Sequence, residues 1–379
     1  MQRVHPFDVV ARILSERLQG REASDDLQAT VGSAELDWER IVGIASAHFV
    51  LPACAAALRD LRSLGSLNDE LGAFLEAVHA ANMERNAELR AELAAAVNVL
   101  NRAGIEPVLL KGAIRLLDGL YPDDGWRMLR DLDLLVARSA LADASRAFEE
   151  AGYAPIEDGA FRRGTGACKI ELHEELFAGS RQLRLLQAVN VLNGSRPLAF
   201  KDATVRIPSV EHQLVHLIGH SQLRHCGHAI GRICLRDRLE AAALLHRPRE
   251  AVCWQEIWAR FVAAGYRRPL LSFLLALGDG AWVTVPAIDE IDRLTELQRR
   301  RISLQARSTV VDYVGSRAGW CVSEFKSQVR ERDAGQPRGI RNLKRLISER
   351  GAVRRMARAF WDRQRLLLHA SPYLSWFVA

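Results

Sequence analysis

The spacing of apolar and polar positions divides the chain into three parts. Up to about residue 85, and again from Ser209 onward, apolar side chains recur every three or four residues, which predicts amphipathic helices. Between these parts the period changes: Ile105–Leu110 is a short run rich in branched residues, and Lys169–His173 alternates polar with apolar side chains. Both patterns are typical of β-strands. We therefore predict an α+β fold, in which a small mixed sheet is flanked by an N-terminal and a C-terminal helical region.

The predicted elements follow from this spacing and from the residues that begin and end them. Asp37 and Ser209 are suited to cap helix N-termini, and Gly104 and Gly152 are suited to end helices. The three predicted regions are residues 1–85, 86–207 and 208–379. The predicted helices include 70–103, 114–120, 139–151, 209–222, 229–246, 253–264, 267–278, 288–315 and 339–368. The predicted strands are 105–110, 127–136, 169–173 and 201–207.

The bulk composition is that of a soluble globular protein. Of the 379 residues, 49% are hydrophobic, and no apolar run is long enough to span a bilayer. The N-terminus lacks the apolar core of a secretory signal peptide. The six cysteines are scattered without C-x-x-C spacing, which argues against a disulfide framework or a zinc cluster. We expect a cytoplasmic protein with reduced thiols.

The formal net charge is +6, and the excess lies toward the C-terminus, where arginine is frequent from Arg299 to Arg365. A basic, arginine-rich segment favours phosphate-bearing or acidic partners, nucleic acid among them. In the other interpretation these arginines form the solvated face of a long helix. The sequence leaves both interpretations open.

Two acids with strand spacing are the strongest chemical signal. Asp131 and Asp133 stand at positions i and i+2 of a predicted strand, so both face one side while Leu132 and Leu134 face the other. Neighbouring carboxylates repel each other unless a cation lies between them. Mg²⁺ suits such a pair, because it is bound through one or two carboxylates together with substrate phosphates. The pair therefore predicts metal-assisted phosphate chemistry, and a solvated strand edge is the alternative.

Three motifs around this pair carry a resemblance to a known family. They are Leu109-Leu110-Lys111-Gly112-Ala113, Tyr121-Pro122, and Arg127-x-x-Arg130-Asp131-Leu132-Asp133-Leu134-Leu135-Val136. Together they resemble the uncharacterised nucleotidyltransferase family of the DNA polymerase β superfamily. Further pieces that fit, and extend the resemblance over roughly residues 37–245, are Asp37–Ile41, Ile170–His173, Leu214–His220 and Arg236-Asp237.

The resemblance implies a nucleotidyltransferase core with a metal site. Asp131 and Asp133 would hold Mg²⁺, and Glu171 on a later strand would complete a set of three catalytic carboxylates, with the neighbouring Glu174 or Glu175 as the alternative third acid. Two ions about 4 Å apart can stabilise both the attacking and the leaving oxygens of an in-line displacement, and Mn²⁺ could substitute. Gly112 would form a turn that brings backbone N–H groups close to nucleotide phosphates. The implied substrates are an NTP and an acceptor hydroxyl or phosphate, with release of pyrophosphate.

The phosphate-binding part departs from the wider superfamily at one position. Gly112 is followed by Ala113 where serine is frequent, so a hydroxyl contact with phosphate is absent. Lys111 is predicted to supply a cation for the phosphates, although its stem could instead be buried. Arg127 and Arg130 flank the acid pair and are predicted to bind the nucleotide, Arg127 through its planar guanidinium. The alternative is that they balance the charge of neighbouring acids.

Histidines recur every four residues on the first predicted helix of the C-terminal region. His212, His216 and His220 share one face of it, and imidazoles at this spacing can chelate a metal. No His-Glu-x-x-His motif or cysteine pair completes such a site. We therefore expect this helix beside the catalytic cleft, with His220 or Asp237 in contact with substrate. His173 is expected in the same cleft or in a structural role.

Two classes of function remain open from the sequence. The leading hypothesis is a Mg²⁺-dependent nucleotidyltransferase that acts on a small molecule, peptide, protein or tRNA, including a toxin-like enzyme that modifies tRNA or protein. The other is a non-catalytic module that binds nucleic acid or protein through this fold and the basic C-terminal region. Salt-sensitive binding that needs no Mg²⁺ and survives loss of Asp131 would favour the second hypothesis.

Overall fold

The structure, a computed structural model, describes residues 4–319 apart from short gaps. The gaps are residues 64, 66, 158, 165–167, 178–181, 183, 248–251, 280–281, 284–290, 309–310, 313–314 and 317–318. The predicted helix 339–368 and most of the arginine-rich segment therefore lie outside the described residues. Within the described ranges, every helix is too short or too polar to cross a bilayer.

The chain divides into two compact units. The first contains Met1–His228 and Ile233–Ser303, and the second contains Ala229–Arg232 and Leu304–Ala379. In the described part of the second unit, the Gln305 amide donates a hydrogen bond to the Ile230 carbonyl at 2.9 Å. The sheet, the candidate site and the helices around them belong to the first unit.

The N-terminal part of the first unit is helical, as predicted. Its helices are α1 Pro6–Leu18, α2 Asp25–Val31, α3 Trp38–Ala47, α4 Leu51–Asp60 and α5 Asp69–Arg102. The Asp37 carboxylate caps α3 by accepting from the Arg40 N–H at 2.9 Å, which confirms the predicted cap. Helix α5 is a single helix of 34 residues, capped by Asn68, and it runs through the predicted boundary at residue 85.

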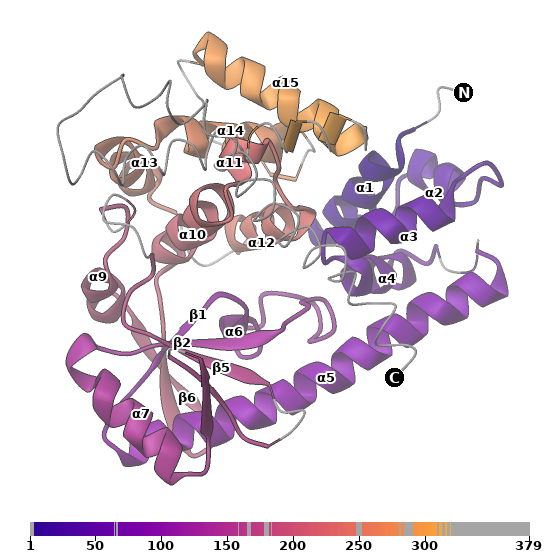
Figure 1. The fold of residues 1–379 in the computed structure, drawn as a ribbon. Helices are drawn as coiled ribbons and strands as arrows, with labels where there is room; N and C mark the ends of the chain where they lie inside the picture. Colours follow the sequence, from indigo (N-terminus) through magenta and orange to yellow (C-terminus); the bar gives the residue numbers. More distant parts are fainter. Residues whose placement is uncertain are drawn as a thin grey trace, which may run out of the picture. The chain divides into compact units, whose positions relative to one another are not determined.

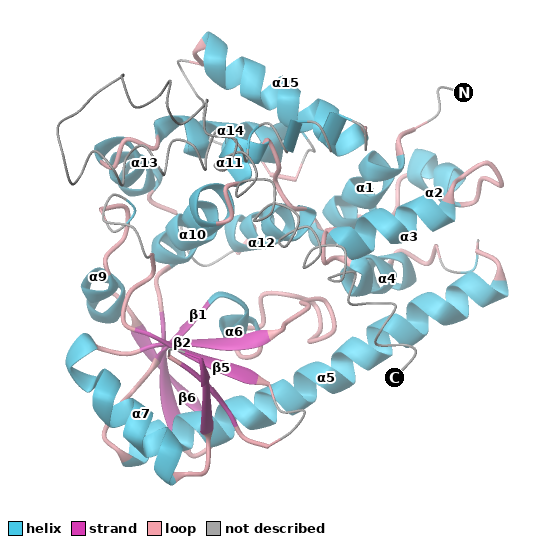
Figure 2. Cartoon of the chain, in the orientation of Figure 1, coloured by secondary structure: helices cyan, strands magenta, loops and turns pink. Residues whose placement is uncertain are grey.

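A seven-stranded mixed sheet follows, with helices around it (Figures 1 and 2). Its strands are β1 Val108–Leu110, β2 Asp131–Leu135, β3 Ala154–Glu157, β4 Ala160–Arg162, β5 Lys169–His173, β6 Arg196–Phe200 and β7 Ala203–Ile207. Across the sheet their order is β3-β4-β5-β2-β1-β7-β6. Strand β2 pairs antiparallel with β1 and parallel with β5, and β1 pairs parallel with β7. The mixed sheet with flanking helices confirms the predicted fold class.

One face of the sheet is buried against α5 and against α7, Leu141–Glu150, which lie side by side in Figure 1. The shared hydrophobic core includes Leu93 and Val97 of α5, Leu132 and Leu134 of β2, Phe148 of α7, and Ile170 and Leu172 of β5. Burying each such side chain contributes about 1.5–3 kcal/mol. Because side chains alternate along a strand, the polar residues between them face the other side of the sheet.

Helices return after the sheet. They are α9 Ala188–Asn193 before β6, and then α10 Val210–Gly219, the π-helix η3 His220–Arg224, α11 Gly227–Ile230, α12 Leu235–Leu245, α13 Trp254–Ala263, α14 Arg267–Asp279 and α15 Arg293–Arg307. The Ser209 hydroxyl caps α10 by accepting from the His212 N–H at 3.3 Å, as predicted. Helix α10 packs on α12 and on the short helix α6, Lys111–Arg115.

Several elements differ from the sequence prediction, among them the predicted helix 229–246, which is divided between α11 and α12. The predicted helix 114–120 is displaced: α6 spans Lys111–Arg115, and the chain turns afterwards at Gly119 with φ 59°. The predicted strand 127–136 begins only at Asp131, because the carbonyls before it accept hydrogen bonds from α5 side chains. Strands β3, β4 and β6 were not predicted; Pro197 of β6 is tolerated because β6 lies at the edge of the sheet.

Candidate functional site

The candidate site is built on the polar side of the neighbouring strands β2 and β5. These strands run parallel, and their register pairs Asp133 with Glu171 and Asp131 with Lys169. His173 follows two residues after Glu171 on the same face. We call this side of the two strands the acidic face. It confirms the predicted strand geometry, in which alternate residues enter the core and the acids between them face the other way.

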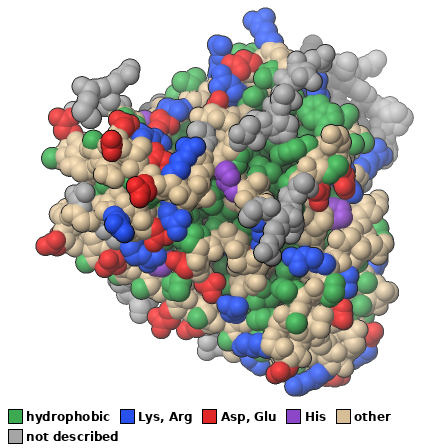
Figure 3. All heavy atoms as spheres, turned by 180° about the vertical axis from the view of Figure 1, so that it is seen from behind, with side chains coloured by type: hydrophobic (Ala, Val, Ile, Leu, Met, Phe, Trp, Pro, Cys, Tyr) green, Lys and Arg blue, Asp and Glu red, His purple; other side chains and the backbone are tan. Residues whose placement is uncertain are grey.

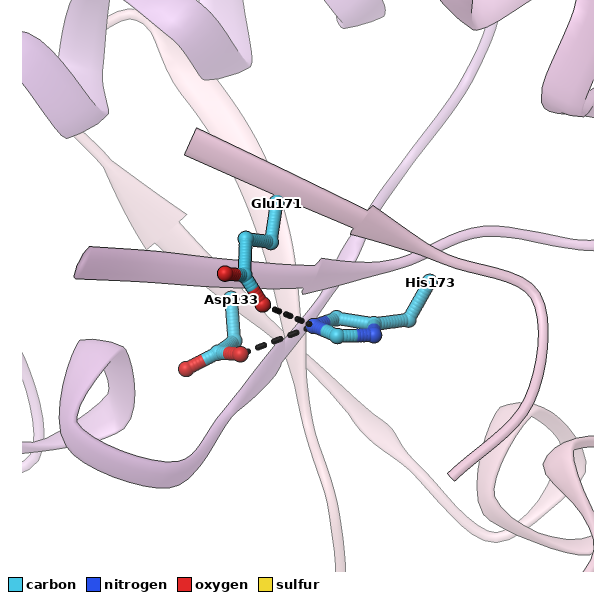
Figure 4. A group of neighbouring side chains, drawn as sticks. All are labelled: Asp133, Glu171 and His173. Atoms are coloured by element: carbon cyan, nitrogen blue, oxygen red, sulfur yellow. Dashed lines mark hydrogen bonds and ion pairs between the residues drawn. The ribbon is translucent and has the colours of Figure 1, made fainter. Parts of the chain in front are cut away.

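His173 connects two carboxylates from different strands (Figure 4). Its Nε2 lies 2.7 Å from Asp133 Oδ1 and 3.4 Å from Glu171 Oε2. The Asp133 side chain is only 2% exposed, so it depends on partners within the protein. Its second partner is Lys111, at the start of α6, whose Nζ lies 2.6 Å from the same Oδ1. Two strands and one helix therefore converge on a single buried carboxylate.

The pKa values of these groups shift in the directions that the contacts dictate. Burial alone would raise the pKa of Asp133, but the hydrogen bond from His173 and the charge of Lys111 lower it. The hydrogen bond with His173 is the main reason why the pKa of Glu171 falls to about 2. Burial opposes protonation of His173, yet its hydrogen bonds to both acids raise its pKa. Both carboxylates are therefore ionised at neutral pH.

Asp131 differs from its two acidic neighbours. Its pKa is raised, first by burial and then by the negative charge of Asp133. In the described part of the chain it forms no ion pair, whereas Glu171 is paired with Lys169 and His173. A carboxylate that is partly buried beside like charges is stabilised by an added cation.

The donor set fits a divalent metal ion. Ligand atoms of Asp133, Glu171 and His173 lie within 4.8 Å of one another, the one such group found among the described residues. Two carboxylate oxygens suit Mg²⁺ or Mn²⁺, and imidazole is a ligand that Mn²⁺ also accepts. The predicted metal set was Asp131, Asp133 and Glu171; the structure brings the latter two together with His173, a residue that we expected in the substrate cleft. The sequence signal for His173 was its place two residues after Glu171.

The segment Lys111-Gly112-Ala113 lies beside the acidic face. The left-handed backbone is at Lys111, with φ 49°, and not at Gly112. Such a conformation is strained for a residue with a side chain, and here Lys111 is held by Asp133. A Cβ at Gly112 would lie 2.6 Å from Leu129 Cδ2, so close packing explains the glycine. The Ala113 side chain is buried in the hydrophobic core, which leaves only its backbone for contact with a ligand.

The two predicted nucleotide-binding arginines are placed differently. Arg130 is exposed, directly before β2. The Arg127 side chain is 12% exposed, and its Nε donates to the Glu240 carboxylate of α12 at 2.9 Å. Arg127 therefore balances the charge of an acid, which was the alternative to nucleotide binding, but this acid is 113 residues away in the sequence and not a neighbour. No local pattern could have indicated Glu240.

The histidines of α10 and η3 form a row. The rings of His216 and His220 lie 5.9 Å apart, and those of His220 and His225 lie 4.4 Å apart. Burial, and next the positive charge of Lys111, lower the pKa of both His216 and His220, so the row lies near the acidic face. Asp237, which we named with His220 as a candidate for contact with substrate, is buried and paired with Arg236 at 3.1 Å. Contact of either residue with a substrate stays a prediction.

Helix α5 holds the loop that leads into β2. Three of its side chains donate to carbonyls of this loop: Asn82 to Gly125 at 2.7 Å, Asn86 to Arg127 at 2.7 Å, and Arg85 to Leu129 at 3.1 Å. One turn earlier, His79 contacts Asp123 at 2.9 Å. The sequence prediction missed this support, although polar residues at helical spacing within an otherwise apolar face are its visible signal.

Comparison with known proteins gives one match. A family model described as "Uncharacterised nucleotidyltransferase" matches residues 34–278, which include α5, the sheet, the acidic face and helices α10 to α14. Neither the curated proteins nor the solved structures gave a match.

Proposed function

The chain belongs to the uncharacterised nucleotidyltransferase family, and we propose that it is a Mg²⁺-dependent enzyme that moves a nucleoside monophosphate from an NTP to an acceptor. The observation that carries the proposal is the parallel register of β2 and β5, which sets Asp133 beside Glu171 with Lys111 at 2.6 Å from Asp133. Acids from two strands next to a lysine suit a divalent cation together with an anionic phosphate chain.

Each residue of the acidic face has a role in the proposal. Asp133, Glu171 and His173, whose ligand atoms lie close together, hold the metal, and Asp131 on the same face of β2 is a further donor. Bound Mg²⁺ would polarise the phosphoryl oxygens and lower the pKa of an acceptor hydroxyl. Lys111, whose side chain is 27% exposed, binds a phosphate oxygen of the NTP. The backbone at Gly112, where packing against Leu129 leaves no room for a side chain, lies next to Lys111 and is proposed to adjoin the phosphates.

The reaction follows from these roles. The acceptor oxygen forms a bond to the α-phosphorus, and the bond from that phosphorus to the bridging oxygen breaks. Pyrophosphate leaves with that oxygen, and Glu171 takes the proton of the acceptor hydroxyl. The acceptor is a hydroxyl or phosphate group of a small molecule, peptide, protein or tRNA.

The test is transfer of label from each α-labelled NTP, with Mg²⁺ or Mn²⁺ and a cell extract, followed by location of the labelled product. Asp131→Asn and Asp133→Asn should each reduce transfer by at least about 100-fold, because loss of groups that hold or orient a metal costs this much or more. Asp131→Asn should keep the thermal unfolding midpoint of the wild type within a few degrees, whereas Asp133→Asn also loses the buried pairing with Lys111 and should lower it.

A matched control is Asp143→Asn on α7, an exposed acid paired with Arg146, which should transfer label as well as the wild type. Retained transfer in both Asp131→Asn and Asp133→Asn would contradict the proposal. Salt-sensitive binding of nucleic acid that needs no Mg²⁺ and survives Asp131→Asn would favour a non-catalytic binding module instead. On the face drawn in Figure 3, positive and negative side chains are interspersed over the described residues.

A further inference from the structure

A buried group of charged residues lies next to the acidic face. We call it the arginine network. Its members are Arg115 and Asp118 from α6 and the turn after it, Arg127 from the loop before β2, and Glu240 and Arg247 from α12 and the residues after it. The side chains of Arg115, Asp118 and Glu240 are between 1% and 5% exposed. Burial of so many charges is costly unless each has a well-placed partner.

Glu240 makes the contacts that connect the two segments flanking the acidic face. One of its oxygens lies 3.3 Å from Arg115 Nε, and the other lies 2.9 Å from Arg127 Nε. Arg115 belongs to the helix that begins with Lys111, and Arg127 stands four residues before Asp131. One carboxylate from α12 therefore contacts both the helix that begins with Lys111 and the loop that leads into β2.

Arg127 is held at two of its three guanidinium nitrogens. Nε donates to Glu240, and Nη1 donates to the Met128 carbonyl at 2.6 Å. The third nitrogen, Nη2, lies 3.7 Å from the position that a Cβ would take at Gly112. The guanidinium thus presents its remaining edge at the glycine that follows Lys111. A planar guanidinium with fixed orientation binds phosphate oxygens better than a mobile one, since less rotamer freedom is lost.

We infer that Glu240 is a positioning residue for nucleotide binding, which holds Arg127 so that its Nη2 contacts a phosphate of the NTP beside Gly112. This inference rests on the proposed function and adds a residue that the motifs around the acid pair do not contain. Glu240 itself touches no substrate; it acts through Arg127.

The direction in which neutralisation of Glu240 changes NTP affinity distinguishes a positioning role from a purely electrostatic one. Glu240 carries a negative charge close to a site proposed for a polyanion, so its neutralisation alone would strengthen NTP binding. If its role is to orient Arg127, neutralisation weakens binding instead. The two explanations therefore predict opposite changes in the same dissociation constant.

The experiment is calorimetric titration of the full-length protein with each of the four NTPs, and with inorganic tripolyphosphate as a probe without a base, in the presence of Mg²⁺. Glu240→Gln should weaken binding about tenfold, and Arg127→Lys should weaken it by a similar factor. In the double variant the second substitution should add little, because Glu240 acts through Arg127. In transfer assays KM for the NTP should rise more than kcat falls.

Two controls exclude a general loss of structure. Leu239→Ala, at a buried apolar position next to Glu240 on α12, should lower the unfolding midpoint while NTP affinity stays the same. Glu256→Gln, which removes a partly exposed pair with Arg260 at 2.9 Å, should change neither quantity. If Glu240→Gln does not fold, Glu240→Asp keeps the charge, shortens the side chain and should weaken binding in the same direction.

Several outcomes would overturn the inference. Equal or tighter NTP binding by Glu240→Gln would exclude the positioning role. The role would also be excluded if the loss of affinity in the double variant equalled the product of the losses in the two single variants. An equal loss of affinity in Leu239→Ala would exclude it as well. A wild-type protein that binds neither the NTPs nor tripolyphosphate would overturn the proposed function as well, which distinguishes that failure from one confined to Glu240.

Discussion

Two clusters of charged side chains meet at α6, and their charges are balanced in different ways. In the arginine network each carboxylate lies between two guanidinium groups: Asp118 between Arg115 and Arg247, and Glu240 between Arg115 and Arg127. On the acidic face, Asp131 instead adjoins like charges, and its pKa is raised by burial and by Asp133. The carboxylates of the first cluster each lie between two cations, whereas Asp131 in the second forms no ion pair with a described residue, although its neighbours Asp133 and Glu171 do.

The difference teaches how structural and binding roles can be separated within one buried polar region. Removing one member of a closed network leaves a buried charge without its partner, and the folded state loses stability. Removing the charge of Asp131, whose pKa is raised by burial and by Asp133, should cost the folded state little and should impair mainly what binds there. Substitution of Arg115 should therefore mainly reduce stability, whereas substitution of Asp131 should mainly reduce transfer.

The largest expected effect is on the stability of the arginine network. Arg115→Met should lower the free energy of unfolding by about 3–5 kcal/mol, because Asp118 and Glu240 lose a partner while remaining buried. The measurement is urea denaturation followed by circular dichroism. Asp131→Asn is the contrasting variant from the acidic face, and its free energy of unfolding should be unchanged or slightly higher. Similar losses in the two variants would remove the distinction between the clusters.

A smaller effect is expected at Gly112, where the two clusters adjoin. Gly112→Ala should destabilise the protein by about 1–3 kcal/mol, because the new Cβ overlaps the Leu129 side chain and forces repacking. Gly43→Ala on α3 is the matched control. Its Cβ would meet nothing within 4 Å, so alanine should be neutral or stabilise by up to about 1 kcal/mol.

A second substitution tests whether overlap with Leu129 causes the destabilisation by Gly112→Ala. In a Leu129→Ala background the cost of Gly112→Ala should be smaller, since the overlapping atoms are gone. An equal cost in both backgrounds would attribute the glycine to backbone conformation, and the close approach to Leu129 would not be the reason for it.

The smallest expected effect is a pH dependence of the free energy of unfolding that comes from His216. This residue lies between the two clusters, since the charges of Lys111, Asp133 and Glu240 all influence its pKa. Burial lowers its pKa in the folded state to about 3, from an ordinary value of 6.5. Between these values only the unfolded state takes up the proton, so stability falls as the pH decreases through this window. The slope from one such group is at most about 1.4 kcal/mol per pH unit.

The measurement for His216 is a series of urea midpoints from about pH 7 to about pH 5, where the difference in proton uptake is large. His216→Phe keeps an aromatic ring against Phe177 and removes the titrating group, so its stability should fall less steeply with acid. Parallel profiles of stability against pH for the wild type and the variant would show that the pKa of His216 does not differ between the folded and unfolded states.

The sequence predicted those parts of the fold that depend on neighbouring residues. Strand alternation placed Asp131 and Asp133 on one face, with Leu132 and Leu134 on the other. Local capping chemistry placed the starts of α3 and α10 at Asp37 and Ser209. These features depend on residues within a few positions of one another, and propensity and periodicity describe such relations well.

The parts that could not be predicted depend on contacts between distant residues. Strand β2 begins late because α5 side chains, more than 40 positions earlier, take the carbonyls of the preceding loop. The partner of Arg127 is Glu240, on a helix 113 positions later. His173 was predicted near the site, but its bond to Asp133 depends on the register of β2 with β5, which no local pattern specifies.

The amide and guanidinium donors of α5 have a practical consequence for dissecting this protein. Asn82 and Arg85 precede the residue at which the sheet-bearing region was predicted to start, yet they bind the backbone just ahead of β2. A fragment trimmed to residues 86–207 would lose those donors and leave peptide oxygens of the loop bare. Minimal versions intended for crystallisation or engineering should therefore retain the whole of α5, from Asn68 onward.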